Sequence, residues 1–203
     1  MLQVGPGLKA GQYVINLELD TGKGSSFPSR LVPFGTIIAA DHWKVSEFKE
    51  HIFSSWADLY SSFRCKLTED MESFTARVPE TWNHLRLRDV TGICPILRDD
   101  RILPRVLLGL TDGKKVAIQV LNTTETIGKA DTVLYSRFLS FQKKTIWNVL
   151  DGAIVMKKDY NTSDLLRAVL SLYFSDPSDV SLSVAKGYPT GKPDQRKTIP
   201  ISV

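Results

Sequence analysis

Polar and apolar residues alternate along residues 12–20, which predicts a β-strand with one apolar face. A second apolar segment covers residues 31–40, but Pro33 and Gly35 interrupt it. Because proline cannot donate a hydrogen bond to a neighbouring strand, this pattern indicates an edge strand or a β-bulge. The chain is therefore expected to begin with two strands joined by a Gly/Ser-rich loop.

Residues 46–63 have the clearest helical pattern in the chain. Their large apolar residues recur at spacings of three and four, as on one face of a helix: Phe48, Ile52, Trp56, Leu59, Tyr60 and Phe63. Ser46 is the predicted N-cap, and Glu47 would lie at the positive end of the helix dipole. We interpret the apolar face as core packing and not as a groove for a partner.

Residues 82–90 alternate between charged and apolar side chains. His84, Arg86 and Arg88 would point to one side of a strand, and Leu85 and Leu87 to the other. This alternation predicts a strand with a charged outer face.

A hairpin is predicted for residues 102–121, where two apolar runs flank Asp112 and Gly113. Both residues of an Asp-Gly pair tolerate a positive φ, so the pair is a strong turn signal. In this arrangement Lys114 and Lys115 would lie at the tip of the hairpin.

Two stretches allow more than one interpretation. Residues 63–78 suit either a hairpin or a helix that continues through Met71. Residues 132–150 suit either a helix or strands broken at residues 142–144.

Further along the chain, residues 153–157 and 180–184 read as short strands, and Ser163 is the expected cap of a helix between them. From residue 187 onward, prolines and basic residues predict a flexible tail. We therefore expect a single globular domain over residues 1–186, followed by a basic tail over 187–203. The fold class is α+β, a mostly antiparallel sheet with two or three packed helices.

Composition agrees with a globular protein: 42% of the 203 residues are hydrophobic and 24% are charged. No apolar run approaches the roughly 18 residues of a membrane span, and no secretory signal is visible. The two cysteines, Cys65 and Cys94, are too few for a disulfide framework. These features predict a cytoplasmic or nuclear protein, or one attached peripherally to a membrane.

The net charge of +4 is unevenly distributed, since residues 81–160 carry thirteen basic and eight acidic groups. Such a bias predicts contact with nucleic acid or with an anionic lipid surface. The candidate binding residues lie in this region and in the tail: Arg86, Arg88, Arg98, Arg101, Lys114, Lys115, Lys143, Lys144, Lys157, Lys158, Arg196 and Lys197. Arg105 lies close to Arg101 in the sequence. Self-association is also expected.

Motifs that carry chemistry are not recognisable in the sequence. The loop that contains Lys23 differs from a phosphate-binding loop, because Gly24 stands where a serine or threonine would bind magnesium. The histidines and cysteines lack the spacing of metal ligands, and no Gly-x-Ser-x-Gly motif is present. No catalytic residue, metal or cofactor is therefore expected.

These observations favour a non-enzymatic structural or binding protein with a basic surface, of which a viral matrix-type or nucleocapsid-associated assembly protein is one example by charge and size. The alternative is a small intracellular hydrolase or nuclease with dispersed catalytic residues. Cys65, flanked by basic residues, paired with a histidine would be its best candidate.

Overall fold

The structure is a computed structural model of the whole chain. The residues that it describes are 7–21, 31–64, 77–90, 95–107, 109–135, 138–140, 145–147, 153–161, 163–165, 168, 182–183 and 198–199. The chain divides into two compact units, Met1–Lys129 and Ala130–Val203, and each unit is described by itself.

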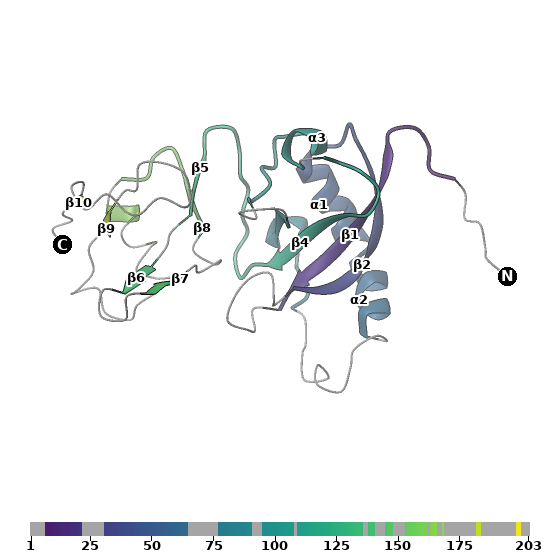
Figure 1. Cartoon of the computed structure of the whole chain (residues 1–203), viewed down its shortest axis with the longest axis horizontal. Helices are drawn as coiled ribbons and strands as arrows, with labels where there is room; N and C mark the ends of the chain where they lie inside the picture. Colours follow the sequence, from purple (N-terminus) through teal and green to yellow (C-terminus); the bar gives the residue numbers. More distant parts are fainter. Residues whose placement is uncertain are drawn as a thin grey trace. The chain divides into compact units, whose positions relative to one another are not determined.

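The first unit is built on a four-stranded sheet with the strand order β2-β1-β4-β3, of which Figure 1 labels β2, β1 and β4. The central strands β1 and β4 run parallel, and each of them pairs with an antiparallel outer strand. The four strands are β1 (Gln12–Asp20), β2 (Leu31–Ala40), β3 (Leu85–Asp89) and β4 (Lys114–Val120).

Strands β1 and β2 agree with the sequence pattern. β2 lies at the edge of the sheet, and its register against β1 shifts where Leu17 faces Gly35 and Glu18 faces Pro33. Phe34 lies between these two pairs, and its side chain is buried. The predicted edge strand and the predicted β-bulge are both confirmed.

The predicted helix over 46–63 is two helices, α1 (Val45–Ser54) and α2 (Trp56–Arg64), separated at Ser55. Ser46 is not the N-cap, because the helix begins one residue earlier and Lys44 precedes it. The Lys44 backbone N–H donates to Glu47 Oε2 at 2.6 Å, so Glu47 supplies the capping contact.

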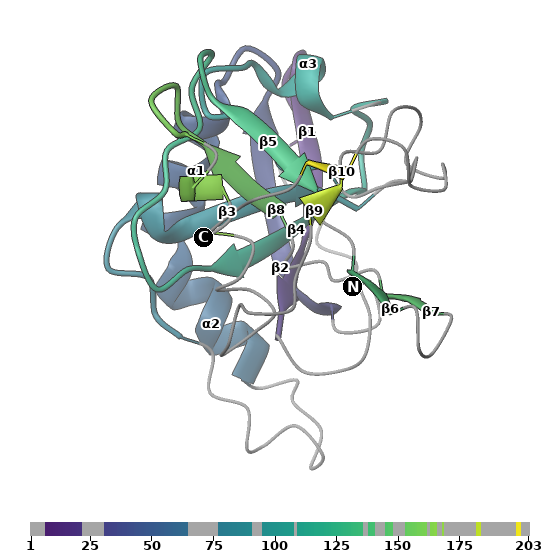
Figure 2. The same cartoon turned by 90° about the vertical axis from the view of Figure 1, so that its left-hand side faces the viewer.

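Both helices lie on the same side of the sheet, as Figure 2 shows, and the core fills the space between them and the strands. The predicted apolar face of the helices is confirmed as core, with Tyr60 half-buried and the other five side chains buried. The contact between α2 and β2 is close: a Cβ added to Gly35 would lie 2.5 Å from Leu59 Cδ2.

The predicted hairpin over 102–121 is wrong in its first arm. Leu103–Val106 forms the short helix α3, for which Pro104 is suited because the first turn of a helix needs no N–H from it. The turn at Asp112 and Gly113 is present, with Gly113 at φ 81°. Asp112 Oδ1 accepts a hydrogen bond from Val14 N at 2.9 Å, and β4 continues from the turn beside β1.

In the second unit, the strand interpretation of residues 132–150 is confirmed for the described residues. β5 (Thr132–Tyr135) pairs with β8 (Ala153–Met156), and β6 (Phe138–Ser140) pairs with β7 (Thr145–Trp147). β9 (Leu182–Ser183) pairs with β10 (Thr198–Ile199). All of these pairs are antiparallel.

The helix expected near Ser163 includes residues 163–165 and 168. Its cap is Asn161 instead of Ser163: Asn161 Oδ1 accepts from Asp164 N, and Asp164 Oδ2 accepts from Asn161 N, each at 3.0 Å. This reciprocal pair is a capping box.

The α+β fold class, with a mostly antiparallel sheet and packed helices, is confirmed. The hairpin or helix considered for residues 63–78 falls largely on residues 65–76, which lie outside the described residues. Most of the tail 187–203 also lies outside them, so the boundary at residue 186 stays a prediction.

Candidate functional site

The basic residues of β3 are engaged inside the first unit. Arg86 Nε donates to Glu125 Oε1 at 2.8 Å, and the two side chains form an ion pair that is mostly shielded from solvent. Arg88 is only 2% exposed. The predicted charged outer face of residues 82–90 is therefore wrong. The loop that follows β4 is anchored by a hydrogen bond from Glu125 N to Asn83 O, and it carries the Glu125 carboxylate to this side of β3.

The two lysines at the start of β4 differ in their surroundings. Lys114 Nζ lies 3.1 Å from Asp89 Oδ1, and both side chains are buried. Lys115 Nζ lies 2.7 Å from Glu18 Oε1, while 59% of its side chain stays exposed. The expected position of both lysines at an exposed hairpin tip is wrong for Lys114.

Exposed cations meet where residues 43–45 run beside residues 101–103. Lys44 and Ile102 form an antiparallel bridge, Val45 N donates to Arg101 O at 2.9 Å, and Leu103 N donates to Trp43 O at 3.0 Å. This pairing brings two distant segments of the chain together. We call the resulting surface the cationic edge, which consists of the exposed residues Lys44, Arg101 and Arg105 and the half-buried Arg98.

Two acidic residues lie at the cationic edge. Glu47 accepts a hydrogen bond from the Lys44 backbone N–H, and Asp100 lies 3.8 Å from Arg98 Nε and 3.9 Å from Arg101 Nε, distances too long for hydrogen bonds. Arg98 is additionally held by a hydrogen bond to the Gly128 carbonyl. Arg98 is therefore tied to the fold, whereas Arg101 makes only a long contact with Asp100.

Half-buried Trp43 lies beside the edge. Its ring meets the ring of His51 edge-on, with centroids 5.0 Å apart. Lys44 was absent from the residues selected from the sequence, since its neighbour Ile102 is far along the chain and no local pattern reveals it.

The remaining candidates belong to the second unit. Lys157 Nζ lies 2.9 Å from Asp131 Oδ2, and Lys158 is exposed. The other four basic candidates are outside the described residues: Lys143, Lys144, Arg196 and Lys197. Their contribution to binding stays a prediction.

A buried ion pair that the sequence did not reveal joins Lys49 of α1 to Asp99, with Nζ and Oδ1 at 2.5 Å. Burial lowers the pKa of Lys49 below 10.5, and the neighbouring Asp99 carboxylate opposes this effect in part. Asp99 Oδ2 also accepts a hydrogen bond from Ile127 N at 2.6 Å. The only local signal is that Lys49 lies three residues before Ile52, next to the apolar face of the helix.

Titratable groups suited to chemistry do not converge in the described part of the chain. His42 is exposed beside Asp41, His51 packs on Trp43, and buried His84 contacts Thr81 Oγ1 through Nδ1 at 3.1 Å. Both cysteines lie outside the described residues. Within those residues no three His, Cys, Asp or Glu side chains are grouped as ligands for a metal ion.

None of the helices in the described ranges has the length and apolar character needed to cross a bilayer. No protein-family model matches the chain, and the comparison with curated proteins also finds no match.

Proposed function

We propose that the chain is a non-enzymatic binding protein whose cationic edge contacts the phosphates of single-stranded nucleic acid. The observation that carries the proposal is the backbone bridge between Lys44 and Ile102, which assembles exposed cations from two segments beside Trp43. Phosphate oxygens are recognised by such clusters of lysine and arginine.

The availability of the cations distinguishes the edge from the other basic residues. Arg86 and Lys114 face carboxylates in shielded positions, and separating such a pair is costly. In contrast, Arg101 is about half exposed and lies at long range from Asp100. Exposed pairs of this kind contribute little, so a phosphate group can replace Asp100 as the partner.

The aromatic ring beside the edge favours a single strand over a lipid surface. Unpaired bases stack on tryptophan and histidine rings, and Trp43 and His51 provide both next to the cations. A lipid surface would need several apolar side chains that project from the edge, whereas in segments 43–45 and 101–103 Ile102 alone is an exposed apolar residue, at 38%.

The test uses the full chain with fluorescent oligouridine, and vesicles that contain phosphatidylserine, over a series of salt concentrations. The double variant Arg101→Glu/Arg105→Glu reverses two charges of the edge. Lys9→Glu/Arg77→Glu makes the same change in charge at exposed positions outside the candidate binding residues. We expect only the edge variant to lose binding to oligouridine.

For neutral substitutions at Arg101 and Arg105, the dependence of log K on log salt concentration should become shallower by about 1.4, which is two contacts at about 0.7 each on a single strand. If the edge and control variants lose equal affinity for oligouridine, the binding depends only on the net charge of the protein, and the edge is refuted as a site. Binding to vesicles but not to oligouridine would identify a lipid surface as the partner instead.

A further inference from the structure

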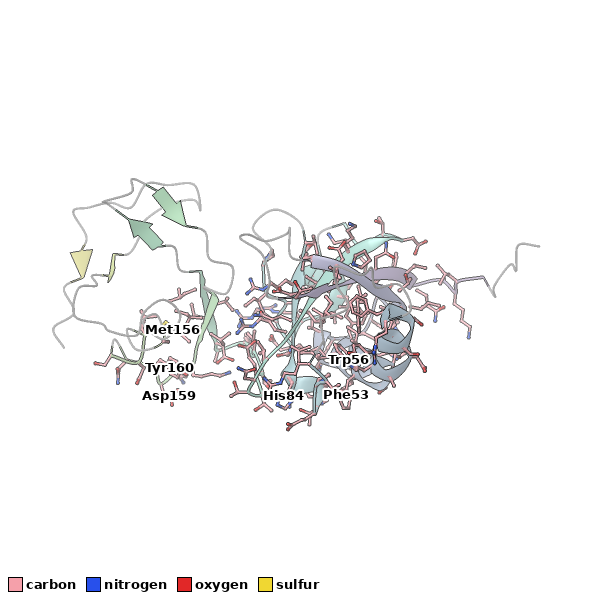
Figure 3. All side chains as sticks on the ribbon, turned by 90° about the horizontal axis from the view of Figure 1, so that it is seen from below. Phe53, Trp56, His84, Met156, Asp159 and Tyr160 are labelled. Atoms are coloured by element: carbon pink, nitrogen blue, oxygen red, sulfur yellow. The ribbon has the colours of Figure 1, made fainter. Side chains whose placement is uncertain are left out.

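An open groove lies at the junction of α1 and α2, where Phe53 and Trp56, labelled in Figure 3, approach the segment before η2 (Trp82–His84). Its volume is about 570 Å³. The groove is lined mainly by apolar and aromatic side chains with a few polar groups, from the two helices and residues 78–79: Phe53, Ser54, Trp56, Ala57, Tyr60, Ser61, Arg64, Val78 and Pro79.

The walls of the groove expose apolar surface. Val78 is 62% exposed, while Phe53 and Tyr60 are half-buried. Single apolar residues on a surface are ordinary, but a continuous apolar concave surface is typical of a binding site.

Trp56 contributes to the lining of the groove. The residue is 5% exposed, and its Nε1–H is buried without an acceptor among the described residues. Because this N–H is closed off from solvent, the indole serves the groove as apolar surface.

Arg64 gives the groove a positive charge at the end of α2. Its side chain is exposed, and no ion pair joins it to a carboxylate within the described ranges. An aromatic, apolar wall with one guanidinium group is complementary to a ligand that has an apolar part and a carboxylate.

We propose that the groove binds a peptide segment of a partner protein in which a bulky apolar residue lies next to an acidic residue. The apolar side chain contacts Phe53, Tyr60 and Val78, and the carboxylate contacts Arg64. A peptide is favoured over a small molecule because the groove is open, whereas small-molecule sites bury about 70–90% of their ligand.

The floor of the groove is fixed before any partner arrives. Trp56 packs on Phe34 with ring centroids 4.8 Å apart, and Phe34 is the residue of the β2 bulge. Leu59 of α2 contacts Gly35 next to it. A rigid surface loses little conformational entropy on binding, so the site is preorganised.

The groove is separate from the cationic edge. The edge adjoins the first residue of α1 and the groove adjoins its last, and a helix of 10 residues spans about 15 Å. The two surfaces also differ in chemistry, since the groove has an apolar wall with a single positive charge and the edge has several positive charges. Failure of either proposal leaves the other unaffected.

The probe is a library of random short peptides displayed on phage, selected on the full chain and counter-selected on Ala57→Glu. Ala57 is exposed and lines the groove, so this variant places a negative charge in the site without disturbing the core. We expect the selected peptides to combine an apolar residue with aspartate or glutamate. Arg64→Glu should weaken their binding by about tenfold or more.

Two further variants make the result specific. Trp56→Phe keeps an aromatic ring on Phe34, so it should weaken binding less than Arg64→Glu. It should also remove the one indole N–H NMR signal, among those of the four tryptophans, that shifts when peptide is added. Ser62→Glu changes an exposed residue of α2 outside the groove and should leave binding unchanged.

Several outcomes would overturn the proposal. Selected peptides without acidic residues, or equal binding to the wild type and Arg64→Glu, would contradict the complementarity of charge. If a simple fatty acid shifts the Trp56 indole N–H NMR signal and no selected peptide does, the groove is a small-molecule site. A concentration-dependent dimer that Ala57→Glu dissociates would identify a second copy of the chain as the occupant.

Discussion

Lys49 and Asp99 form an ion pair that is almost completely buried, with exposed side-chain fractions of 1% and 5%. Asp99 also joins two other parts of the first unit. Its backbone carbonyl accepts from Ser46 N at 3.2 Å, and its backbone N–H donates to Ile127 O at 3.0 Å. One residue therefore links the start of α1 to the loop that follows β4.

Replacement of Asp99 by asparagine should destabilise the fold strongly. The variant leaves the Lys49 ammonium group buried without its ion-pair partner, and the expected decrease in the free energy of unfolding is about 3–5 kcal/mol. Urea denaturation followed by circular dichroism measures the decrease.

The matched control is the double variant Lys49→Met/Asp99→Asn. Methionine fills the space of the lysine stem, and asparagine keeps an acceptor for Ile127 N. The double variant should recover most of the lost stability, since an apolar side chain can replace a buried charge without penalty. If it is as unstable as the single variant, the cost comes from packing and not from the unpaired charge.

Stability should rise at alkaline pH because of Lys49. Its pKa is lower in the folded chain than the 10.5 of the unfolded chain, chiefly through burial. Between these two values the unfolded chain binds more protons, so the free energy of unfolding increases as the pH approaches about 10.5. Urea denaturation at neutral pH and at about pH 10 should show this rise relative to the Lys49→Met/Asp99→Asn variant. A constant difference between the two proteins would contradict it.

Gly35→Ala should destabilise the contact between β2 and α2. The new Cβ would lie 2.5 Å from Leu59 Cδ2, so the Leu59 side chain, which is only 8% exposed, must shift. We expect a decrease of about 1–3 kcal/mol in the free energy of unfolding.

In a Leu59→Ala background the clash is absent. The same Gly35→Ala change should then be neutral or stabilising by up to about 1 kcal/mol, because alanine restricts the unfolded chain more than glycine does. A double-mutant cycle by thermal or urea denaturation measures the coupling. Equal effects in the two backgrounds would show that Leu59 is not the cause.

Lys114→Ala and Lys115→Ala should differ in stability despite their adjacent positions. Loss of Lys114 leaves Asp89 buried without this cation and should cost about 3–5 kcal/mol, whereas the exposed pair of Lys115 contributes about 1 kcal/mol or less. Differential scanning calorimetry of the two variants separates the two expectations. Similar melting temperatures would mean that Asp89 is satisfied without Lys114.

Local patterns were sufficient where a segment's environment follows from its own sequence. The alternation in residues 12–20 and the breakers at Pro33 and Gly35 predicted β1 and the bulged edge strand β2. The apolar face of residues 46–63 predicted the helical side of the core. The break at Ser55 was missed, because the apolar spacing continues across it.

The errors concern partners that are distant in sequence. Arg86 and Arg88 alternate with leucines as they would on a solvated strand, but Glu125 reaches Arg86 from a later loop. Lys114 was placed at a hairpin tip because nothing in its neighbourhood indicates Asp89. The cationic edge was only half visible for the same reason, since the pairing of Lys44 with Ile102 depends on the folded chain.

The parallel pairing of β1 with β4 has a consequence for the order in which the chain can fold. β1 residue Ile15 is in register with Lys114, so the centre of the sheet cannot close until nearly all of the first unit has left the ribosome. Until then β1 has an open edge next to apolar side chains, a state prone to pairing with other chains. Truncations that end before residue 114 should therefore aggregate, and a fragment ending at Lys129, the last residue of the first unit, contains the complete sheet and the loop that closes over Asp99.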